Sequence, residues 1–385
     1  MMRTPLHRWI ADRIGLPEAE LSREAIERSQ LMKLRETLSW AKERSTFYRG
    51  LLRRHDPQEL ATLKDLSSFP FTTSVDLKRQ PHQFLCVSQS EVVRVVTLHT
   101  SGTTGEPKRI FFDAHDQEST IDFFHHGMST LVGPGDRVLI LMPGTIAGSV
   151  GALLVKGLNR LGATAISHGL VVDVPRACQA MEDEKVECLV GLPTQVLWLA
   201  RMGRGNHAPR CVLLSADHVP TAISQELERI WGCEVLAHYG MSEMGFGGGV
   251  ECAARRGYNL READLYVEIV HPETGSIVPD GQSGEIVFTT LRRRAMPLIR
   301  YRTGDVGRFI TEDCPCGTVL KTLAPVASRL DSRRTLANGA SISMADLDEV
   351  IFPLAGALDF SATLASEGGL DCLRVDVRLA DQEHG

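Results

Sequence analysis

The stretch RVLILM (137–142), which leads into SVGALLVKGLNRLG (149–162), decides the fold, because a short apolar run precedes an amphipathic helical pattern. The alternation then recurs in three further pairs of segments: ATAIS (163–167) and VPRACQAMEDE (174–184), VECLVG (186–191) and PTQVLWLARM (193–202), RCVLLS (210–215) and PTAISQELERIW (220–231). Strands alternating with helices of this length predict βαβ units and a mainly parallel sheet. Ligands of such sheets bind at the carboxyl ends of the strands, so polar motifs that directly follow these runs are candidate site residues.

The flanking regions have different patterns. Residues 19–55 show helical periodicity, which predicts a helical arm, and the sequence after Gly245 alternates like strands joined by Gly, Pro and Asp turns. We therefore expect an α/β protein with a large N-terminal domain of doubly wound, mainly parallel sheets, a β subdomain, and a small, incomplete α+β C-terminal lobe. The expected parts are the arm at 1–90, the core at 91–327 with its β subdomain from about 245, and the hinge and shortened lobe at 328–385.

Composition excludes several classes of protein. The chain has 385 residues, 43% of them hydrophobic, and a net charge of -6, so no broad basic field is available for nucleic acid. Residues 138–155 carry no charge, but Pro143 and three glycines interrupt them, which favours a strand, a glycine loop and a helix over a membrane span. The N-terminus lacks a signal-peptide pattern, which predicts a cytoplasmic protein. Nine cysteines, an odd number, favour free or metal-bound thiols over a disulfide framework.

Three short motifs carry the chemistry. TSGTTGEPK (100–108) has glycines that expose backbone N–H groups, with hydroxyls and Lys108 as further donors to a polyphosphate, although a surface turn is the alternative. Glu243, in HYGMSEMG (238–245), follows a predicted strand and is a candidate Mg²⁺ ligand, or else a solvated glutamate. Asp305, in IRYRTGDVGRF (299–309), is a candidate acceptor for ribose hydroxyls, or else a turn residue.

In this order and at these separations, the three motifs resemble the signature of the adenylate-forming (acyl-CoA synthetase) superfamily. The closer resemblance is to its phenylacetate-CoA ligase branch, carried by GMSEMGFGGGVEC (240–252) and by VEIVHPETGSIVPDGQSGEIVFTTLRRRAMPLIRYRTGD (267–305). It covers roughly residues 30–350. It implies an ATP-dependent acid:CoA ligase that forms an acyl-adenylate and uses ATP, Mg²⁺ and coenzyme A. We expect a small aromatic or otherwise apolar carboxylic acid as substrate, no nucleic-acid or membrane partner, and leave a homodimer open.

The resemblance also implies roles for individual residues. Glu243, Lys108 and Thr103 are the expected catalytic residues, with Glu243 on Mg²⁺. The β and γ phosphates would be held by the loop that consists of Thr100, Ser101, Gly102, Thr103, Thr104 and Gly105. The rest of the nucleotide would contact Ser215, Ala216, Asp217, His238, Tyr239, Gly240, Met241, Ser242, Asp305 and Arg329. Tyr239 would lie by the adenine, and Asp305 with Arg329 would bind the ribose hydroxyls.

Cys252, Cys314 and Cys316 resemble three ligands of a structural zinc site, the last two on the turn DCPCG (313–317). Ordinary unliganded cysteines are the alternative. In many relatives a histidine provides the fourth ligand, but here Asn259 takes its place, so the fourth ligand is left open between Asp264, Asn259, water and none.

The C-terminal lobe departs from the family pattern. Relatives end in a mobile lobe with a lysine that contacts the adenylate, whereas no lysine follows Lys321 here. An active ligase with a reduced lobe is the first hypothesis. The alternatives are an adenylating enzyme with a non-CoA acceptor, like coenzyme F390 synthetases, and a nucleotide-binding pseudoenzyme that acts as a partner or sensor. We interpret Arg292, Arg293 and Arg294 as a solvated turn.

Overall fold

The computed structural model describes residues 2–98, 107–203, 207–367 and 370–380. These residues form two compact units, each discontinuous in sequence. Unit 1 comprises residues 1–130 and 239–324, and unit 2 comprises residues 131–238 and 325–385. Each unit combines segments that are distant in the sequence, whereas the expected domains are continuous segments. The expected domain boundaries therefore stay a prediction.

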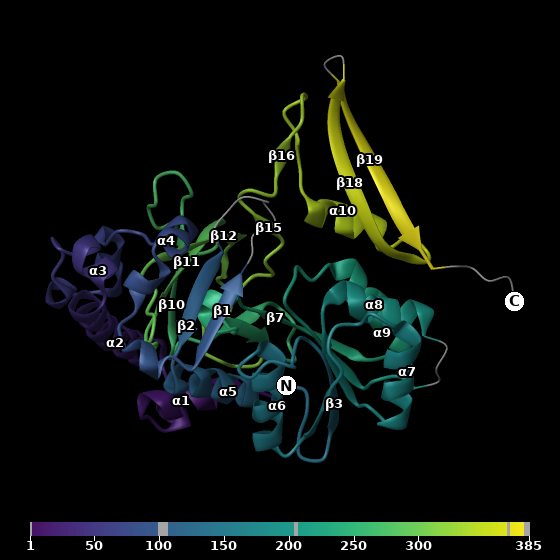
Figure 1. Cartoon of the computed structure of the whole chain (residues 1–385), viewed down its shortest axis with the longest axis horizontal. Helices are drawn as coiled ribbons and strands as arrows, with labels where there is room; N and C mark the ends of the chain where they lie inside the picture. The colour runs from purple at the N-terminus through teal and green to yellow at the C-terminus, as the bar shows by residue number, and fades with distance from the viewer. Residues whose placement is uncertain (1, 99–106, 204–206, 368–369, 381–385) are drawn as a thin grey trace, which may run out of the picture. The chain divides into compact units, whose positions relative to one another are not determined.

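Unit 1 begins with helices and continues into antiparallel strands (Figure 1). Its helices are α1 Pro5–Ile14, α2 Arg23–Arg44, α3 Thr46–Leu51, α4 Ser74–Arg79 and α5 Ala114–Met128, with the 3-10 turns η1 Glu18–Glu20, η2 Pro57–Glu59, η3 Leu63–Ser68, η4 Pro81–Phe84, η5 Gln89–Glu91 and η6 Ser242–Met244. Its strands are β1 Arg94–Leu98, β2 Lys108–Phe112, β8 Gly249–Glu251, β9 Tyr258–Leu260, β10 Leu265–Val270, β11 Gly284–Thr290, β12 Tyr301–Gly307, β13 Phe309–Ile310 and β14 Thr322–Leu323.

The helical arm is confirmed in α2 and α3. The Ser22 hydroxyl accepts a hydrogen bond from the backbone N–H of Ala25 and so caps α2, and Ser45 caps α3 in the same way. Leu34 and Leu38, on the stripe that the periodicity defines, are buried. One face of α2 therefore lies in the core of unit 1.

Strands β10, β11 and β12 pair antiparallel in sequence order, and β1 pairs antiparallel with β2. In β12 the side chains of alternate residues are buried, including Tyr301, Thr303 and Asp305. The pairing with β11 shifts register between Glu285 and Val287, opposite Arg302 to Val306, so β12 is distorted just before Asp305.

Unit 2 contains the parallel sheet that the sequence predicts. Its elements are β3 Arg137–Leu141, α6 Val150–Leu161, β4 Thr164–Ser167, α7 Val174–Asp183, β5 Cys188–Gly191, α8 Pro193–Met202, β6 Cys211–Leu214, α9 Thr221–Trp231 and β7 Glu234–Tyr239, at whose last residue unit 1 resumes. The strands pair in parallel in the order β4-β3-β5-β6-β7. Residues of α7, α8 and α9 share one buried apolar cluster with the strands, and Figure 1 shows these helices side by side.

The uncharged stretch 138–155 is indeed a strand, a loop and a helix, because it contains all of β3 except Arg137 and the first half of α6. No helix among the described residues is both long and apolar enough to cross a bilayer.

The C-terminal segment of unit 2 contains short strands, one helix and a long hairpin (Figure 1). Its elements are β15 Ser328–Arg329, β16 Arg334–Thr335, β17 Ser341–Ile342, α10 Met344–Ile351, β18 Ala357–Glu367 and β19 Leu370–Leu379. The side chain of Phe352, after α10, joins the apolar cluster under α8 and α9, and the Trp198 indole donates to the carbonyl of Leu358 at 2.8 Å. The segment is therefore packed against the helices of its own unit.

Candidate active site

Lys108 and Glu243 form a buried ion pair in unit 1. The Lys108 ammonium lies 2.5 Å from Glu243 Oε1, and their side chains are 16% and 5% exposed. The Tyr301 hydroxyl donates a hydrogen bond to the same oxygen at 3.2 Å. Two of the three residues expected to be catalytic are therefore brought together. The third, Thr103, and the whole loop Thr100–Gly105 lie outside the described residues.

The conformation around Glu243 depends on glycine. Turn η6 ends at Gly245, whose φ of 74° lies in the left-handed region that side chains with a Cβ rarely adopt. At Gly247, a Cβ would lie 2.2 Å from a ring carbon of Phe123. The GMSEMGFGGG segment thus turns sharply and packs close to α5, which keeps Glu243 beside Lys108.

Tyr239 and Asp305 form a second contact in unit 1. The Tyr239 hydroxyl donates to Asp305 Oδ2 at 2.9 Å, and both side chains are buried. The bond joins the end of β7 to β12, so the tyrosine orients the carboxylate that the resemblance assigns to the ribose.

Ser215 and His238 lie together in unit 2, just after β6 and near the end of the adjacent parallel strand β7. The Ser215 hydroxyl lies 2.8 Å from His238 Nδ1. Between Ser215 and Asp217, Ala216 has a φ of 71°, so the chain turns sharply where the sequence predicts a nucleotide contact. This is the position at which parallel sheets bind ligands.

Arg329 is in β15 of unit 2, and its guanidinium lies 3.6 Å from Asp331 Oδ1. Their side chains are 53% and 83% exposed, so this ion pair contributes little to stability.

Cys252, Cys314 and Cys316 lie in one cluster in unit 1, as the resemblance implies. The Sγ atoms of Cys252 and Cys314 are 3.6 Å apart, and those of Cys314 and Cys316 are 3.3 Å apart. A hydrogen bond from the Cys252 thiol lowers the pKa of Cys316 to about 7, and the same bond together with burial raises the pKa of Cys252. Three convergent thiols fit the donor set of a tetrahedral zinc ion.

Of the two side chains considered as fourth ligand, Asp264 is excluded by the structure. Its carboxylate lies 2.7 Å from Arg13 and 2.6 Å from Arg261, and it is not grouped with the thiols. Although burial opposes its charge, Arg261 and Arg13 hold the pKa of Asp264 below its usual range. Asn259 is fully buried, and its Oδ1 has no hydrogen-bond partner in the described part of the chain, so it stays a candidate.

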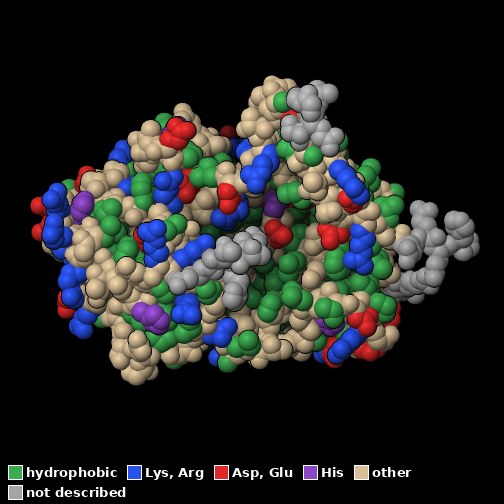
Figure 2. Space-filling view, turned by 45° about the horizontal axis from the view of Figure 1, so that its top comes forward, with side chains coloured by type: hydrophobic (Ala, Val, Ile, Leu, Met, Phe, Trp, Pro, Cys, Tyr) green, Lys and Arg blue, Asp and Glu red, His purple; other side chains and the backbone are tan. Residues whose placement is uncertain are grey.

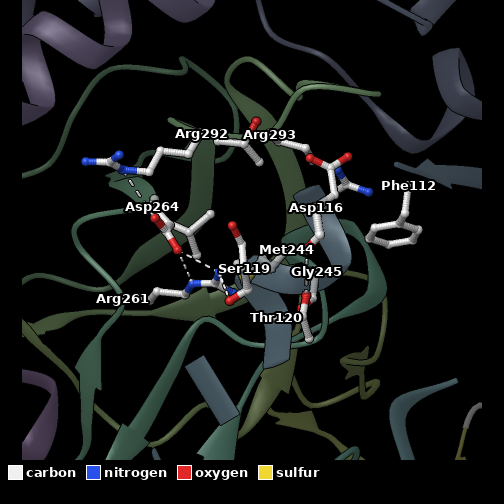
Figure 3. Close-up of a pocket in the computed structure, with 12 residues that line it drawn as sticks. Phe112, Asp116, Ser119, Thr120, Met244, Gly245, Arg261, Asp264, Arg292 and Arg293 are labelled. Atoms are coloured by element: carbon white, nitrogen blue, oxygen red, sulfur yellow. Dashed lines mark hydrogen bonds and ion pairs between the residues drawn. The ribbon is translucent and has the colours of Figure 1, made fainter. Parts of the chain in front are cut away.

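The arginine run 292–294 is not the solvated turn that we expected; only Arg294 is exposed. Arg292 donates to the carbonyls of Ala263 and Arg13, at 3.1 and 2.8 Å. Figure 3 shows Arg292 and Arg293 beside Asp264 and Asp116 around a pocket. The pocket measures about 30 Å³, which suffices for water but not for a substrate. The hydrogen-bond acceptors of Arg292 are backbone carbonyls. Every residue has such a carbonyl, so the sequence pattern could not predict that these would bind the arginine.

Tyr301 is a further site residue that sequence reasoning missed. It precedes Asp305 by four residues in a strand, so a period of two would have placed both side chains on one face. The signal was present, but the motif directed attention only to the aspartate.

The charged surface agrees with the low net charge. Figure 2 shows Lys and Arg interspersed with Asp and Glu on the visible face, rather than one field of a single sign. This distribution offers no extended basic surface on that face for a polyanion.

The fold and these clusters define an adenylate-forming enzyme. The model of the family described as AMP-binding enzyme matches residues 53–291, and the chain belongs to this family.

Similar proteins support this assignment. The chain is 31% identical to phenylacetate-coenzyme A ligase of Pseudomonas putida, over 97% of this chain and 87% of that protein. It is 30% identical to phenylacetate-coenzyme A ligase of Escherichia coli (strain K12), over 95% and 85% of the two chains. The crystal structure of 2-hydroxyisobutyryl-CoA ligase in the postadenylation state matches with a TM-score of 0.84 and 23% identity, over 94% of this chain and 80% of that one.

Proposed function

We propose that this protein is an ATP-dependent acid:CoA ligase of the phenylacetate-CoA ligase type, which acts on a small aromatic or apolar carboxylic acid. In the first half-reaction the carboxylate attacks the α phosphate of ATP and pyrophosphate leaves. In the second, the thiol of coenzyme A attacks the acyl-adenylate and AMP leaves. The observation that carries the proposal is the Lys108–Glu243 pair, at 2.5 Å, in a chain so similar to two phenylacetate-coenzyme A ligases.

The pair is suited to receive a metal–nucleotide complex. Glu243 offers a nearly buried carboxylate oxygen, the hard donor that Mg²⁺ prefers, and Lys108 offers a mobile ammonium for phosphate. When bound, Mg²⁺ would supply positive charge that neutralises the phosphate oxygens. On nucleotide binding Glu243 would exchange the ammonium for the metal, and Lys108 would turn to the phosphate oxygens.

The remaining residues would orient the nucleotide. Asp305, held by the Tyr239 hydroxyl, would accept hydrogen bonds from the ribose, and Arg329 would assist it. Ser215, Ala216 and Asp217 would contact the adenine. Positioning of this kind supplies much of the rate in group-transfer reactions, because the reactants are held in line before the reaction.

Pyrophosphate exchange tests the proposal directly. The purified chain would be assayed for incorporation of labelled pyrophosphate into ATP over phenylacetate, benzoate, 2-hydroxyisobutyrate and butyrate, and then for thioester with coenzyme A. We expect exchange with at least one acid and thioester from the same acid. ATP binding without exchange for any acid would contradict the proposal, and exchange without thioester would indicate a different acceptor.

We also propose that Cys252, Cys314 and Cys316 bind a structural zinc ion, with Asn259 or water as fourth ligand. Protein purified without chelator should contain about one zinc per chain. Cys316→Ser should lose most of the zinc and unfold at a lower temperature, whereas Cys372→Ser, at an exposed thiol, should keep it. Equal zinc content in both variants would contradict the site. A cytoplasmic location and a homodimer stay predictions.

A further inference from the structure

Arg293 links the two segments that carry the ion pair. It lies in the loop between β11 and β12, and its Nη1 donates to the backbone carbonyl of Glu243 at 2.5 Å. Its Nη2 lies 3.4 Å from the carbonyl of Phe111, three residues after Lys108 in β2. One guanidinium therefore contacts the backbone of η6 and the backbone of β2.

Aromatic stacking strengthens the same link. The guanidinium carbon of Arg293 lies 4.3 Å from the centroid of the Phe112 ring. That ring stacks on Phe246, with centroids 5.7 Å apart and an angle of 11° between the planes. Phe246 follows Glu243 by three residues, so the stack joins β2 to the glycine-rich segment a second time. Figure 3 shows Arg293 with Phe112, Met244 and Gly245.

The charge on Arg293 is not explained by an ion pair. Within the described ranges it has no carboxylate within salt-bridge distance, and its Nε is covered and has no hydrogen-bond partner. Burial lowers its pKa, although Asp116 and Glu243 partly oppose this. A buried charge without a direct partner is unfavourable, so stability alone gives little reason for a guanidinium here.

A guanidinium suits this place because its planar fork can donate to two acceptors at once. An ammonium on a flexible stem is a point donor and does not reproduce that geometry. Backbone carbonyls do not titrate, so the hydrogen bonds that they accept from Arg293 persist while the side chains of Lys108 and Glu243 change partners. Residues that orient a metal ligand from behind often affect affinity for the metal by about 10- to 100-fold.

We propose that Arg293 is a positioning residue, which fixes the backbone of Glu243 against β2 so that the Glu243 carboxylate stays aimed at the metal when the Lys108 ammonium moves to the nucleotide. This inference rests on the proposed function, because it assumes that Glu243 binds the metal of a metal–ATP complex.

The test compares Arg293→Met with Arg292→Met. Arg292 is a matched control, because it is in the same loop and also donates to two backbone carbonyls, but these belong to Ala263 and Arg13. Calorimetry would give the affinity of each variant for α,β-methylene-ATP with Mn²⁺ and with chelator. The affinity with Mn²⁺ divided by the affinity with chelator is the metal-dependent gain. This ratio measures the contact between Glu243 and the metal, and its measurement requires no turnover.

In Arg293→Met the ratio should fall about tenfold, the lower end of the range for residues behind a metal ligand, while Arg292→Met should keep it within about twofold. Arg293→Lys should be intermediate and guards against a variant that does not fold. Similar thermal midpoints for the two methionine variants, with only Arg293→Met losing the metal-dependent gain, would support the proposal. Equal ratios in the two variants would overturn it.

The proposed function can fail separately. If the wild-type chain shows the metal-dependent gain but no pyrophosphate exchange with any acid, the ligase assignment is wrong and the role of Arg293 is still decided by the ratio. If the wild-type chain exchanges pyrophosphate and Arg293→Met keeps the full gain, only the positioning role is wrong.

Discussion

Two ion pairs of unit 1, Arg300–Glu268 and Lys108–Glu243, differ in how completely their charges are satisfied. The side chains of Arg300 and Glu268 are each 1% exposed, and two guanidinium nitrogens donate to the two carboxylate oxygens at 3.1 and 3.0 Å. Arg300 also donates to the carbonyls of Ser67 and Phe69. In contrast, Lys108 contacts a single oxygen of Glu243 with a point charge.

The difference shows which pair can exchange partners. Breaking the Arg300–Glu268 contact would strand two buried charges that have bidentate geometry and backbone acceptors, so this pair is structural. The Lys108–Glu243 contact can be replaced by phosphate for the ammonium and by a metal for the carboxylate, with little loss of electrostatic energy. Two buried ion pairs of the same unit therefore have different roles, one structural and one exchangeable. The number of hydrogen bonds that fix each pair distinguishes the two roles.

The largest effect should come from breaking the structural pair. Arg300→Met leaves Glu268 buried and uncompensated, so the free energy of unfolding should fall by about 3–5 kcal/mol. Urea unfolding measures this change. In Arg300→Met/Glu268→Leu both charges are gone, and a large part of the loss should be recovered. A loss below about 1 kcal/mol in the single variant would mean that the pair is not structural.

Breaking the exchangeable pair should affect the reaction instead. Glu243→Gln removes the charge but keeps the shape, so pyrophosphate exchange should fall by about 10²- to 10³-fold, as is typical when one electrostatic contact to the transition state is lost. ATP affinity and the free energy of unfolding should change far less. An unchanged exchange rate would remove Glu243 from its metal role, and a loss of stability as large as that of Arg300→Met would erase the distinction between the pairs.

Tyr301→Phe probes the support of Glu243 with a smaller change. The variant loses one hydrogen bond to Glu243 Oε1 but keeps the ring, which lies 5.5 Å from that of Phe288 between centroids. A hydrogen bond to a charged acceptor contributes about 1.5–3 kcal/mol, so exchange should fall at least about tenfold. Tyr266→Phe, a tyrosine of the same unit without a described contact to Glu243, is the control. Equal rates in wild type and Tyr301→Phe would show that the Tyr301 hydroxyl does not help to orient the carboxylate.

The sequence predicted the parts of this comparison that depend on periodicity and on motifs. The parallel strands β3 to β7 and the arm helices follow apolar patterns, and Glu243, Lys108 and Asp305 lie in recognisable motifs. The roles of Arg300 and Arg293 depend on backbone carbonyls contributed by distant segments. No pattern of side chains encodes such acceptors, and for that reason a run of three arginines was interpreted as a surface turn.

Asp348 shows what burial does to a carboxylate for which no salt bridge is found in the described part of the chain, unlike Glu243 and Glu268. In unit 2, burial together with Asp217, Glu349 and Asp359 raises the pKa of Asp348 to about 7 from an ordinary value of 3.8. The folded state therefore binds more protons than the unfolded state between these two values, so stability falls as pH rises from about 4 to 7 and levels off above.

Asp348→Asn should remove this dependence and give the smallest of the four effects. Because the amide is never charged, the variant should be more stable than wild type at pH 8, by on the order of 1–2 °C in thermal midpoint, and nearly equal to it at pH 4. Thermal unfolding at the two pH values measures the difference. If the variant kept the wild-type dependence, the raised pKa would belong to another carboxylate of the group. If the dependence disappears, a half-buried carboxylate surrounded by other carboxylates weakens the fold at neutral pH.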